Sequence, residues 1–435
     1  MEPPVSTLGD RIRARRKELG LTQTQLGGGN LTKGFISLVE KGRAKPSLET
    51  LLLLAERLDK PVGYFLEPGS LLSTKAVQVA VSCAWIAIKQ GDYTQAAERF
   101  EEAIRLGREN QDKDTQAECY IGLATALAHL RQFDLAMDNL KRGQELTAVS
   151  GNSQHLVRVS HVLGVIAYLQ RRFEEARHHL LEGFRRFQEV AHADLSLGGI
   201  LLYNLGNTYM ELGDHIEASR WYQEALALVE PTEDLHRLGL VHVQLGVAQR
   251  ERGDYDGAIE HLAKAKHLFE VLQDTRLLGW AHNSMGITLL ARGNVDEAIT
   301  HIQTSLRIKE RVGDDPGRAR SLTELGRALT MKGALDEADA ALAEADRLSA
   351  KFGDSTEAAR IRVAWARLRS AEGEINDAVG YYEQAIEAFE SLKMDSDLAN
   401  ACHELGELLL EHKRPSEAAP YLARTLRVLR AEKHH

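Results

Sequence analysis

The chain has 435 residues, of which 43% are hydrophobic and 27% charged, and its formal net charge is −9. This composition is typical of a soluble globular protein, and the length exceeds what one hydrophobic core usually supports, which predicts several domains or a repeat array. The charge is uneven, because residues 1–67 carry a net charge of +3 and the remainder carries −12. If the protein binds nucleic acid, we therefore expect the contact to involve residues 1–67 only.

The sequence contains no recognisable targeting, metal-binding or catalytic motif. Residues 77–88 form the best apolar run, and they fall short of the ~18 residues that a membrane span needs. The first ten residues, MEPPVSTLGD, lack a basic region and an apolar core, so we expect a cytoplasmic protein without membrane contact. Three cysteines without CxxC spacing and seventeen histidines without HExxH spacing argue against a metal site. We expect no cofactor and no enzymatic activity.

Residues 1–67 predict a domain of five short helices. A basic helix over residues 8–20 ends at a glycine. Thr22 begins a short second helix with capping-box spacing, and Thr32 caps a third helix that carries an apolar stripe. The segment SLETLLLLAERL, residues 47–58, forms the fourth, and PVGYFL, residues 61–66, closes the domain.

The stretch GGGNLTKG, residues 27–34, permits two interpretations. A phosphate-binding P-loop needs the pattern GxxxxGK[ST] between a strand and a long helix, so that backbone amides and a lysine converge on phosphate. Here the order is T-K-G, no β-rich run precedes it, and helices are predicted on both sides. We therefore interpret the stretch as the loop and the second helix of a helix-turn-helix.

The segment LTQTQLGGGNLTKGFISLVEKGRAKPSLETL resembles the XRE family of DNA-binding domains. L-T-Q in the second helix, F-I-S-L-V-E-K-G in the third and K-P-S-L-E-T-L at the fourth carry the resemblance. The span from Leu21 to Glu40 is one residue shorter than the usual family pattern, and its glycines predict a short second helix. The resemblance implies that the third helix enters the major groove with its amino end toward the bases. A helix-turn-helix that contacts only protein is the alternative, which the basic turn KGRAK disfavours.

This docking geometry gives each exposed polar residue of the domain an expected role. The residues expected at base edges are Thr32, Lys33, Gly34, Ser37 and Leu38. Those expected to bind phosphate are Gln23, Lys41, Arg43 and Lys45. Arg16 and Glu40 occupy positions that in this family form a buried ion pair between the first and third helices.

From residue 71 onward the sequence is a repeat. An alanine five places after each turn recurs every 40 residues, with one interval of 42, at Ala96, Ala136, Ala176, Ala218, Ala258, Ala298, Ala338, Ala378 and Ala418. Another small residue, such as Gly206 or Gly326, lies twelve residues before each alanine. Two small residues at this offset allow two antiparallel helices to approach closely, so each unit predicts a helical hairpin.

The pattern resembles the tetratricopeptide repeat (TPR), most fully in YNLGNTYMELGDHIEASRWYQEALAL, residues 203–228. The usual unit has about 34 residues, and the longer unit here looks like the variant of bacterial signal-regulated proteins. A HEAT array has a similar period but lacks the paired small residues. The predicted fold is therefore all-α, with a five-helix XRE-type head over residues 1–67, a short EPGS connection, and a right-handed solenoid of nine 40-residue hairpins over residues 71–435.

The TPR resemblance implies a concave face, lined by the first helices, that holds peptides or partner proteins. The candidate residues on it are Asn207, Asn283, Arg320, Arg327, Arg360 and Arg367. Stacked arginines of adjacent repeats could surround one pocket and grip a carboxylate, such as a peptide carboxyl terminus. The asparagines could hold an extended peptide by its backbone amides. The alternative is that the arginines are solvated or paired within their own helix, as Arg320 would be with Glu324.

The order of the two modules resembles the RRNPP group of peptide-regulated transcription factors, which act in quorum sensing. The resemblance implies that the partners are operator DNA in duplex form and a peptide or protein ligand. It also implies a homodimer in which ligand binding changes the relation between two DNA-binding heads. A TPR scaffold that recruits partner proteins to DNA without sensing a small ligand is the alternative function.

Overall fold

A computed structural model describes residues 7–60, 62–65, 71–107 and 112–432, and every regular element in these ranges is a helix. The chain divides into two compact units, Met1–Asp194 and Leu195–His435. The first unit holds the predicted head and three hairpins, and the second holds six hairpins. The predicted EPGS connection lies outside the described residues.

The head consists of four α-helices and one 3-10 helix. These are α1 (Leu8–Glu18), α2 (Gln23–Gly27), α3 (Lys33–Glu40), α4 (Leu48–Arg57) and η1 (Val62–Tyr64). Residues of all five elements contribute to one apolar core, which includes Ile12, Leu26, Ile36, Leu54 and Val62. The fifth expected helix is present as the short 3-10 helix η1.

The glycines after α2 stop the helix. Gly28 and Gly29 have φ values of +53° and +84°, in the left-handed region that glycine adopts without steric cost. The Arg57 guanidinium caps the end, donating from Nη1 to the Leu26 carbonyl at 2.9 Å and to the Gly27 carbonyl. The five-residue α2 confirms the prediction of a short second helix.

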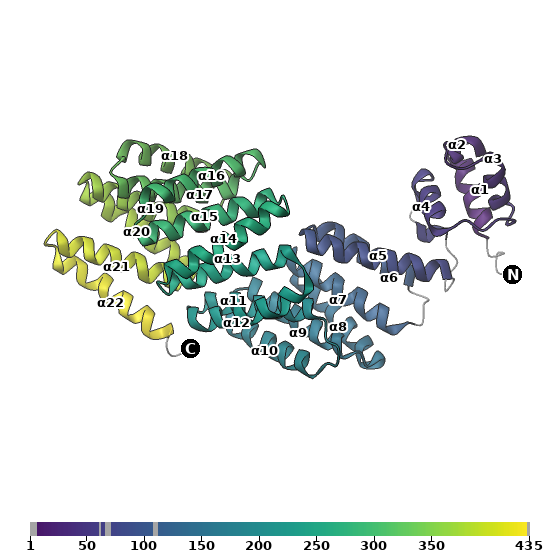
Figure 1. Cartoon of the computed structure of the whole chain (residues 1–435), viewed down its shortest axis with the longest axis horizontal. Coiled ribbons are helices and arrows are strands. Elements are labelled where there is room, and N and C mark those ends of the chain that lie inside the picture. Colours follow the sequence, from purple (N-terminus) through teal and green to yellow (C-terminus); the bar gives the residue numbers. More distant parts are fainter. Residues whose placement is uncertain (1–6, 61, 66–70, 108–111, 433–435) are drawn as a thin grey trace. The chain divides into compact units, whose positions relative to one another are not determined.

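The rest of the described chain forms nine helical hairpins, whose paired helices lie side by side in Figure 1. The pairs are α5 (Leu71–Gln90) with α6 (Tyr93–Gly107), α7 (Lys113–His129) with α8 (Phe133–Ser150), α9 (Ser153–Leu169) with α10 (Phe173–Glu189), α11 (Leu195–Glu211) with α12 (His215–Val229), α13 (Leu235–Glu251) with α14 (Tyr255–Val271), α15 (Thr275–Arg292) with α16 (Val295–Arg311), α17 (Asp315–Lys332) with α18 (Leu335–Phe352), α19 (Ser355–Glu372) with α20 (Ile375–Ser391), and α21 (Asp395–Glu411) with α22 (Pro415–Glu432). One further 3-10 helix, η2 (Glu230–Thr232), follows α12.

The small residues that define the repeat lie where the two helices of a hairpin touch. A Cβ atom on Gly206 would lie 2.4 Å from the Tyr222 ring, and one on Gly326 would lie 2.5 Å from Leu342. Ala218, the repeated alanine of the same hairpin as Gly206, is fully buried. The repeat period is therefore fixed by positions at which a larger side chain would separate the helices.

Candidate functional site

The inward side of α3 anchors the helix in the head. Ile36 and Val39 are buried in the core, and the Thr32 hydroxyl caps the helix by accepting a hydrogen bond from the Phe35 amide at 3.1 Å. On α1, a Cβ atom on Gly9 would lie 2.5 Å from the Val39 carbonyl oxygen, so this glycine permits close packing of α1 on α3. The position of α3 is therefore set by packing on one side only, and its other side stays available.

The expected base-contacting residues lie on that available side. Thr32, Lys33, Gly34 and Leu38 are exposed, and Ser37 is half-buried. A Cβ atom added to Gly34 would meet only the Thr32 hydroxyl, at 3.9 Å. Packing within the head therefore does not require a glycine at position 34.

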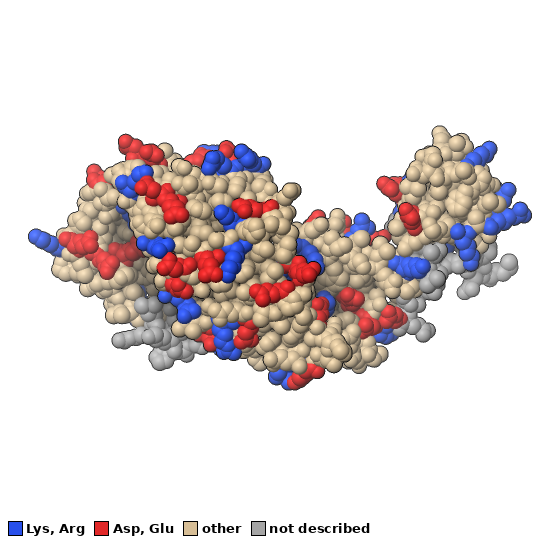
Figure 2. Space-filling model, in the orientation of Figure 1, with Lys and Arg blue, Asp and Glu red and all other residues tan. Residues whose placement is uncertain are grey.

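The turn after α3 presents the expected phosphate-binding cations. Lys41, Arg43 and Lys45 are all exposed. The turn is held by hydrogen bonds from the amides of Arg43 and Ala44 to the Leu38 carbonyl, at 2.8 and 3.2 Å. Figure 2 shows Lys and Arg side chains on the visible surface of the head. Three cations thus extend from a structured turn next to α3, a suitable arrangement for backbone phosphates.

Arg16 and Glu40 form an ion pair between α1 and α3. The Arg16 Nε donates to Glu40 Oε1 at 2.5 Å and its Nη2 donates to Oε2 at 3.1 Å, while Nη1 donates to the Leu21 carbonyl at 2.7 Å. The side chains are only 11% and 4% exposed. Burial alone would raise the pKa of Glu40, but hydrogen bonds from Arg16 and Gln23 outweigh it and lower the pKa below its usual value.

Gln23, which is expected to bind phosphate, also contacts the ion pair. Its Nε2 donates to Glu40 Oε2 at 2.9 Å, so the amide nitrogen is directed at the ion pair. The same nitrogen has a second N–H, which remains the donor for the expected phosphate contact. No local pattern in the sequence indicates the contact with Glu40, because α2 and α3 meet only once the turn between them is folded.

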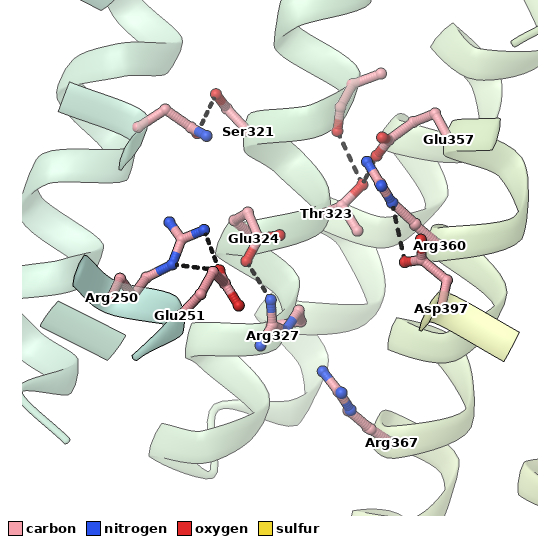
Figure 3. A network of polar contacts seen from close by, with 12 residues as sticks. Arg250, Glu251, Ser321, Thr323, Glu324, Arg327, Glu357, Arg360, Arg367 and Asp397 are labelled. Atoms are coloured by element: carbon pink, nitrogen blue, oxygen red, sulfur yellow. Dashed lines mark hydrogen bonds and ion pairs between the residues drawn. The ribbon is translucent and has the colours of Figure 1, made fainter. Parts of the chain in front are cut away.

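The six candidate ligand residues all lie on first helices of the second unit. Asn207 is on α11, Asn283 on α15, Arg320 and Arg327 on α17, and Arg360 and Arg367 on α19. We call this set the candidate ligand face. Figure 3 shows Arg327, Arg360 and Arg367 of this set, together with neighbouring polar side chains.

Three of the four arginines already have carboxylate partners. Arg327 pairs with Glu324 at 2.6 Å, Arg360 with Asp397 at 3.5 Å, and Arg367 with Glu404 at 2.5 Å. The expected cluster of unbalanced cations is therefore wrong, because carboxylates alternate with the guanidinium groups. Glu324 does form an ion pair within its own helix, but its partner is Arg327 and not Arg320.

Arg320 is the exception on this face. It is exposed, and no carboxylate lies within ion-pair distance of it among the described residues. The nearby Glu357 is buried, accepts a hydrogen bond from the Thr323 hydroxyl at 2.6 Å, and has a pKa raised by burial. Arg320 is thus the arginine of the set that can take a carboxylate from outside without losing an existing partner.

The carboxylate partners follow a spacing that the sequence does contain. Asp397 follows Arg360 by 37 residues, and Glu404 follows Arg367 by the same interval. Two residues on adjacent first helices meet when their separation in the sequence equals one repeat minus about one helical turn. A search for opposite charges at this offset would have found both pairs.

The two asparagines are held by their carboxamide oxygens. Asn207 Oδ1 accepts from the Tyr222 hydroxyl at 2.7 Å and from Gln244 Nε2 at 3.1 Å. Asn283 Oδ1 accepts from the Ser321 hydroxyl at 2.7 Å, and the Asn283 side chain is mostly buried. At Asn283 the amide nitrogen is the end left to donate to a ligand.

The described helices offer no membrane span and no metal centre. None of them is both long and apolar enough to cross a bilayer. Across the same residues, no three His, Cys, Asp or Glu side chains gather as metal ligands would.

Comparison with known proteins identifies both modules. A helix-turn-helix family model matches residues 12–65. Tetratricopeptide-repeat models match residues 84–148, 199–270, 277–348 and 363–431. A comparison with curated protein sequences finds no match.

Several solved structures share the fold. The crystal structure of Rap protein complexed with Competence and Sporulation Factor is 15% identical, with a TM-score of 0.66 over 83% of this chain and 99% of the Rap chain. The apo form of the quorum sensor NprR from B. thuringiensis is 17% identical, with a TM-score of 0.63 over 82% and 99%. The Rap conjugation gene regulator of plasmid pLS20 in complex with the Phr* peptide is 13% identical, with a TM-score of 0.55 over 82% and 96%. At these identities the likeness shows the fold alone.

Proposed function

We propose that this chain, which joins a helix-turn-helix domain to an array of tetratricopeptide repeats, is a cytoplasmic transcriptional regulator controlled by a peptide or protein ligand. The DNA-binding half rests on α3, which is anchored on one side and presents Lys33, Gly34 and Leu38 on the other. Lys33 can donate to guanine O6 or N7, and Leu38 can pack on a thymine methyl group. Thr32 and Ser37 complete the base-reading set, and Lys41, Arg43 and Lys45 bind the flanking phosphates.

Similar folds support a peptide ligand. Two of the structures named above are complexes with Competence and Sporulation Factor and with the Phr* peptide, and a third is a quorum sensor. In this chain we place the ligand on the candidate ligand face. The Asn207 and Asn283 amide groups donate to backbone carbonyls of an extended peptide, and Arg320 takes a carboxylate. Arg327, Arg360 and Arg367 contact the ligand only by exchanging their present partners.

We also propose that the protein acts as a homodimer. One head offers a single recognition helix, and helix-turn-helix proteins commonly place two such helices about 34 Å apart on a pseudo-palindromic site. The ligand then acts by changing the relation between the two heads. Dimerisation is assigned to the repeats.

The experiment begins with footprinting of the protein across the genome to find its operator. Operator binding is then measured with and without short synthetic peptides encoded beside the gene. We expect one peptide to change the affinity, and we expect the same peptide with an amidated carboxyl terminus to be weaker if the terminal carboxylate binds Arg320. Binding that responds to no peptide would favour the scaffold function, in which the repeats recruit protein partners.

The Arg320→Ala variant separates the two halves of the proposal. It should bind the operator normally without peptide, because Arg320 is far along the chain from the head and forms no ion pair within the described residues. The response to the free-acid peptide should fall to that of the amidated one. An unchanged response would show that the carboxylate binds elsewhere.

A further inference from the structure

A buried lysine, Lys309, is linked to Asn283 through the Ser321 hydroxyl. Lys309, in the last turn of α16, is 6% exposed, and no carboxylate lies within ion-pair distance of it in the described residues. Its Nζ donates to the Ser321 hydroxyl at 2.8 Å and to the Gly317 carbonyl at 3.1 Å. Ser321, labelled in Figure 3, in turn contacts Asn283 Oδ1 at 2.7 Å. The ammonium group is therefore two hydrogen bonds away from the candidate ligand face.

The direction of each hydrogen bond in this chain follows from donor and acceptor chemistry. A protonated lysine has three N–H donors and no acceptor, so the Ser321 oxygen must accept from Lys309. The Ser305 hydroxyl lies 2.7 Å from the Gly279 carbonyl, which can only accept, so its proton points there. Ser305 then has no proton for Ser321, 3.2 Å away.

Ser321 has one proton and two possible acceptors, Ser305 and Asn283. The Asn283 oxygen is closer, at 2.7 Å against 3.2 Å, and an amide oxygen is the usual acceptor for a hydroxyl. The proton therefore goes to Asn283 Oδ1. With its oxygen used, Asn283 keeps its Nδ2 group, for which the described residues supply no hydrogen-bond partner.

We infer that Lys309 is a positioning residue that acts through Ser321 to fix the polarity of Asn283, so that this side chain offers N–H donors and not a carbonyl oxygen to a ligand. This inference rests on the proposed function for its meaning, because the offered donors matter only if a ligand binds this face. It makes Asn283 selective for an acceptor, such as a peptide carbonyl. The same position could otherwise bind a backbone N–H.

Asn207 provides an internal comparison. Its oxygen accepts from Tyr222 and Gln244, but a hydroxyl and a carboxamide can each also accept a hydrogen bond. Nothing at Asn207 forbids reversal of its contacts. Of the two asparagines, only Asn283 is linked through its hydrogen-bond partner to a group that cannot accept a hydrogen bond, the Lys309 ammonium.

The charge of Lys309 is sensitive to its surroundings. Burial lowers its pKa to about 8, Asp314 and Glu357 act to raise it, and Arg320 acts to lower it further. Deprotonation gives the amine a lone pair, so Ser321 can then donate to Lys309 and accept from Asn283 Nδ2. The polarity of Asn283 is therefore free to reverse once Lys309 is neutral.

The test uses the full chain without ligand, isotopically labelled at the side-chain Cγ of asparagine. The Cγ resonances of Asn283 and Asn207 are assigned through the Asn283→Asp and Asn207→Asp variants. In the wild type, the Asn283 resonance should move upfield as the pH is raised through about 8, because its oxygen loses the Ser321 hydrogen bond. The Asn207 resonance should not follow this transition.

Two variants test the inference directly. In Lys309→Met, the Asn283 resonance should show no transition near pH 8, because the group that ionises there is gone. In Ser321→Ala, which keeps the lysine but breaks the relay, the resonance should be independent of pH. If Lys309→Met does not fold, the wild-type titration and Ser321→Ala still decide. An Asn283 resonance that does not titrate in the wild type, or that titrates equally in Ser321→Ala, would overturn the inference.

A binding measurement separates this inference from the proposed function. Raising the pH through about 8 should weaken binding of the operator-active synthetic peptide to the wild type by roughly 10-fold, the size of one lost hydrogen bond, and should leave binding to Lys309→Met unchanged. If the resonances behave as expected but peptide affinity is unchanged, the relay stands and Asn283 is not a ligand contact. If the resonances do not respond while peptide binding persists, the proposed function stands and the relay fails.

Discussion

The buried pair of Arg16 and Glu40 gives the sharpest stability prediction for the head. In Glu40→Gln the carboxylate is lost while the side chain keeps its shape. The Arg16 guanidinium, 11% exposed, then loses its counter-charge and one of the two side-chain oxygens that accept from it, while its bond to the Leu21 carbonyl remains. Breaking a buried pair from one side typically costs about 3 to 5 kcal/mol. Because Gln23 also donates to Glu40, the variant disturbs packing among α1, α2 and α3 together.

A surface pair of the same helix is the matched control. Arg15 and Glu18 are 3.0 Å apart, but the Glu18 side chain is 58% exposed. Glu18→Gln should therefore cost less than about 1 kcal/mol. The double variant Arg16→Met with Glu40→Leu removes both buried charges and should recover most of the loss seen in Glu40→Gln.

Hydrogen exchange of the full chain, read on peptides from α1 and α3, measures the local free energy of unfolding of the head. We expect exchange to quicken by roughly two to nearly four orders of magnitude in Glu40→Gln, as about 3 to 5 kcal/mol requires, and to change little in Glu18→Gln. The pKa of Glu40 is lowered in the folded state, so its contribution is present above the unfolded pKa of about 4.3 and is lost as the pH falls through the folded value. Equal exchange rates in Glu40→Gln and Glu18→Gln would show that burial does not increase the contribution of the Arg16–Glu40 pair to stability.

Other parts of the molecule give further predictions. Lys33→Ala should relax the sequence preference of operator binding, whereas Arg43→Ala should weaken all duplexes alike and reduce the salt slope by about one; a uniform loss in both variants would contradict the placement of α3. Deleting residues 71–435 should sharply weaken operator binding if dimerisation resides in the repeats, with melting measured alongside because Leu106 packs on the head core. Burial lowers the pKa of His282 to about 4, so its stabilisation of the repeats is present above about pH 6.5 and is lost as the pH falls toward the folded value; His282→Gln should flatten the dependence of the melting temperature on pH over this range.

The repeat could be predicted from the sequence because its signal lies in residues that touch. Gly206 and Ala218 mark the points where the helices of one hairpin meet, so their spacing reports the geometry directly. The ion partners of Arg360 and Arg367 lie 37 residues away in the chain, so only a search across repeats, and not local spacing, indicates them. Arg367 finds Glu404 on the next first helix, a contact that depends on the stagger between adjacent hairpins. Local spacing, as between Arg320 and Glu324, suggested the wrong pairing.

The head shows the same division between local and tertiary signals. The cap at Thr32 and the short α2 follow from residues adjacent in the chain. Gln23, the residue expected to bind phosphate, also donates to Glu40 across the turn. Arg57 caps α2 from α4, and no local pattern identifies it. A polar side chain near a helix end can serve several partners, and only the tertiary arrangement selects one.

The balance of charge on the candidate ligand face determines where specificity can come from. A ligand carboxylate that displaces Glu404 from Arg367 exchanges one ion pair for another, so the net gain is small. Arg320 has no described partner to lose, and it alone of the four arginines can add a pair. The remaining discrimination must then come from directional hydrogen bonds, which the asparagines supply. Because the Asn283 oxygen is held by a chain that ends in a donor-only ammonium, we expect the proposed ligand site to distinguish ligands by the direction of a hydrogen bond as well as by charge.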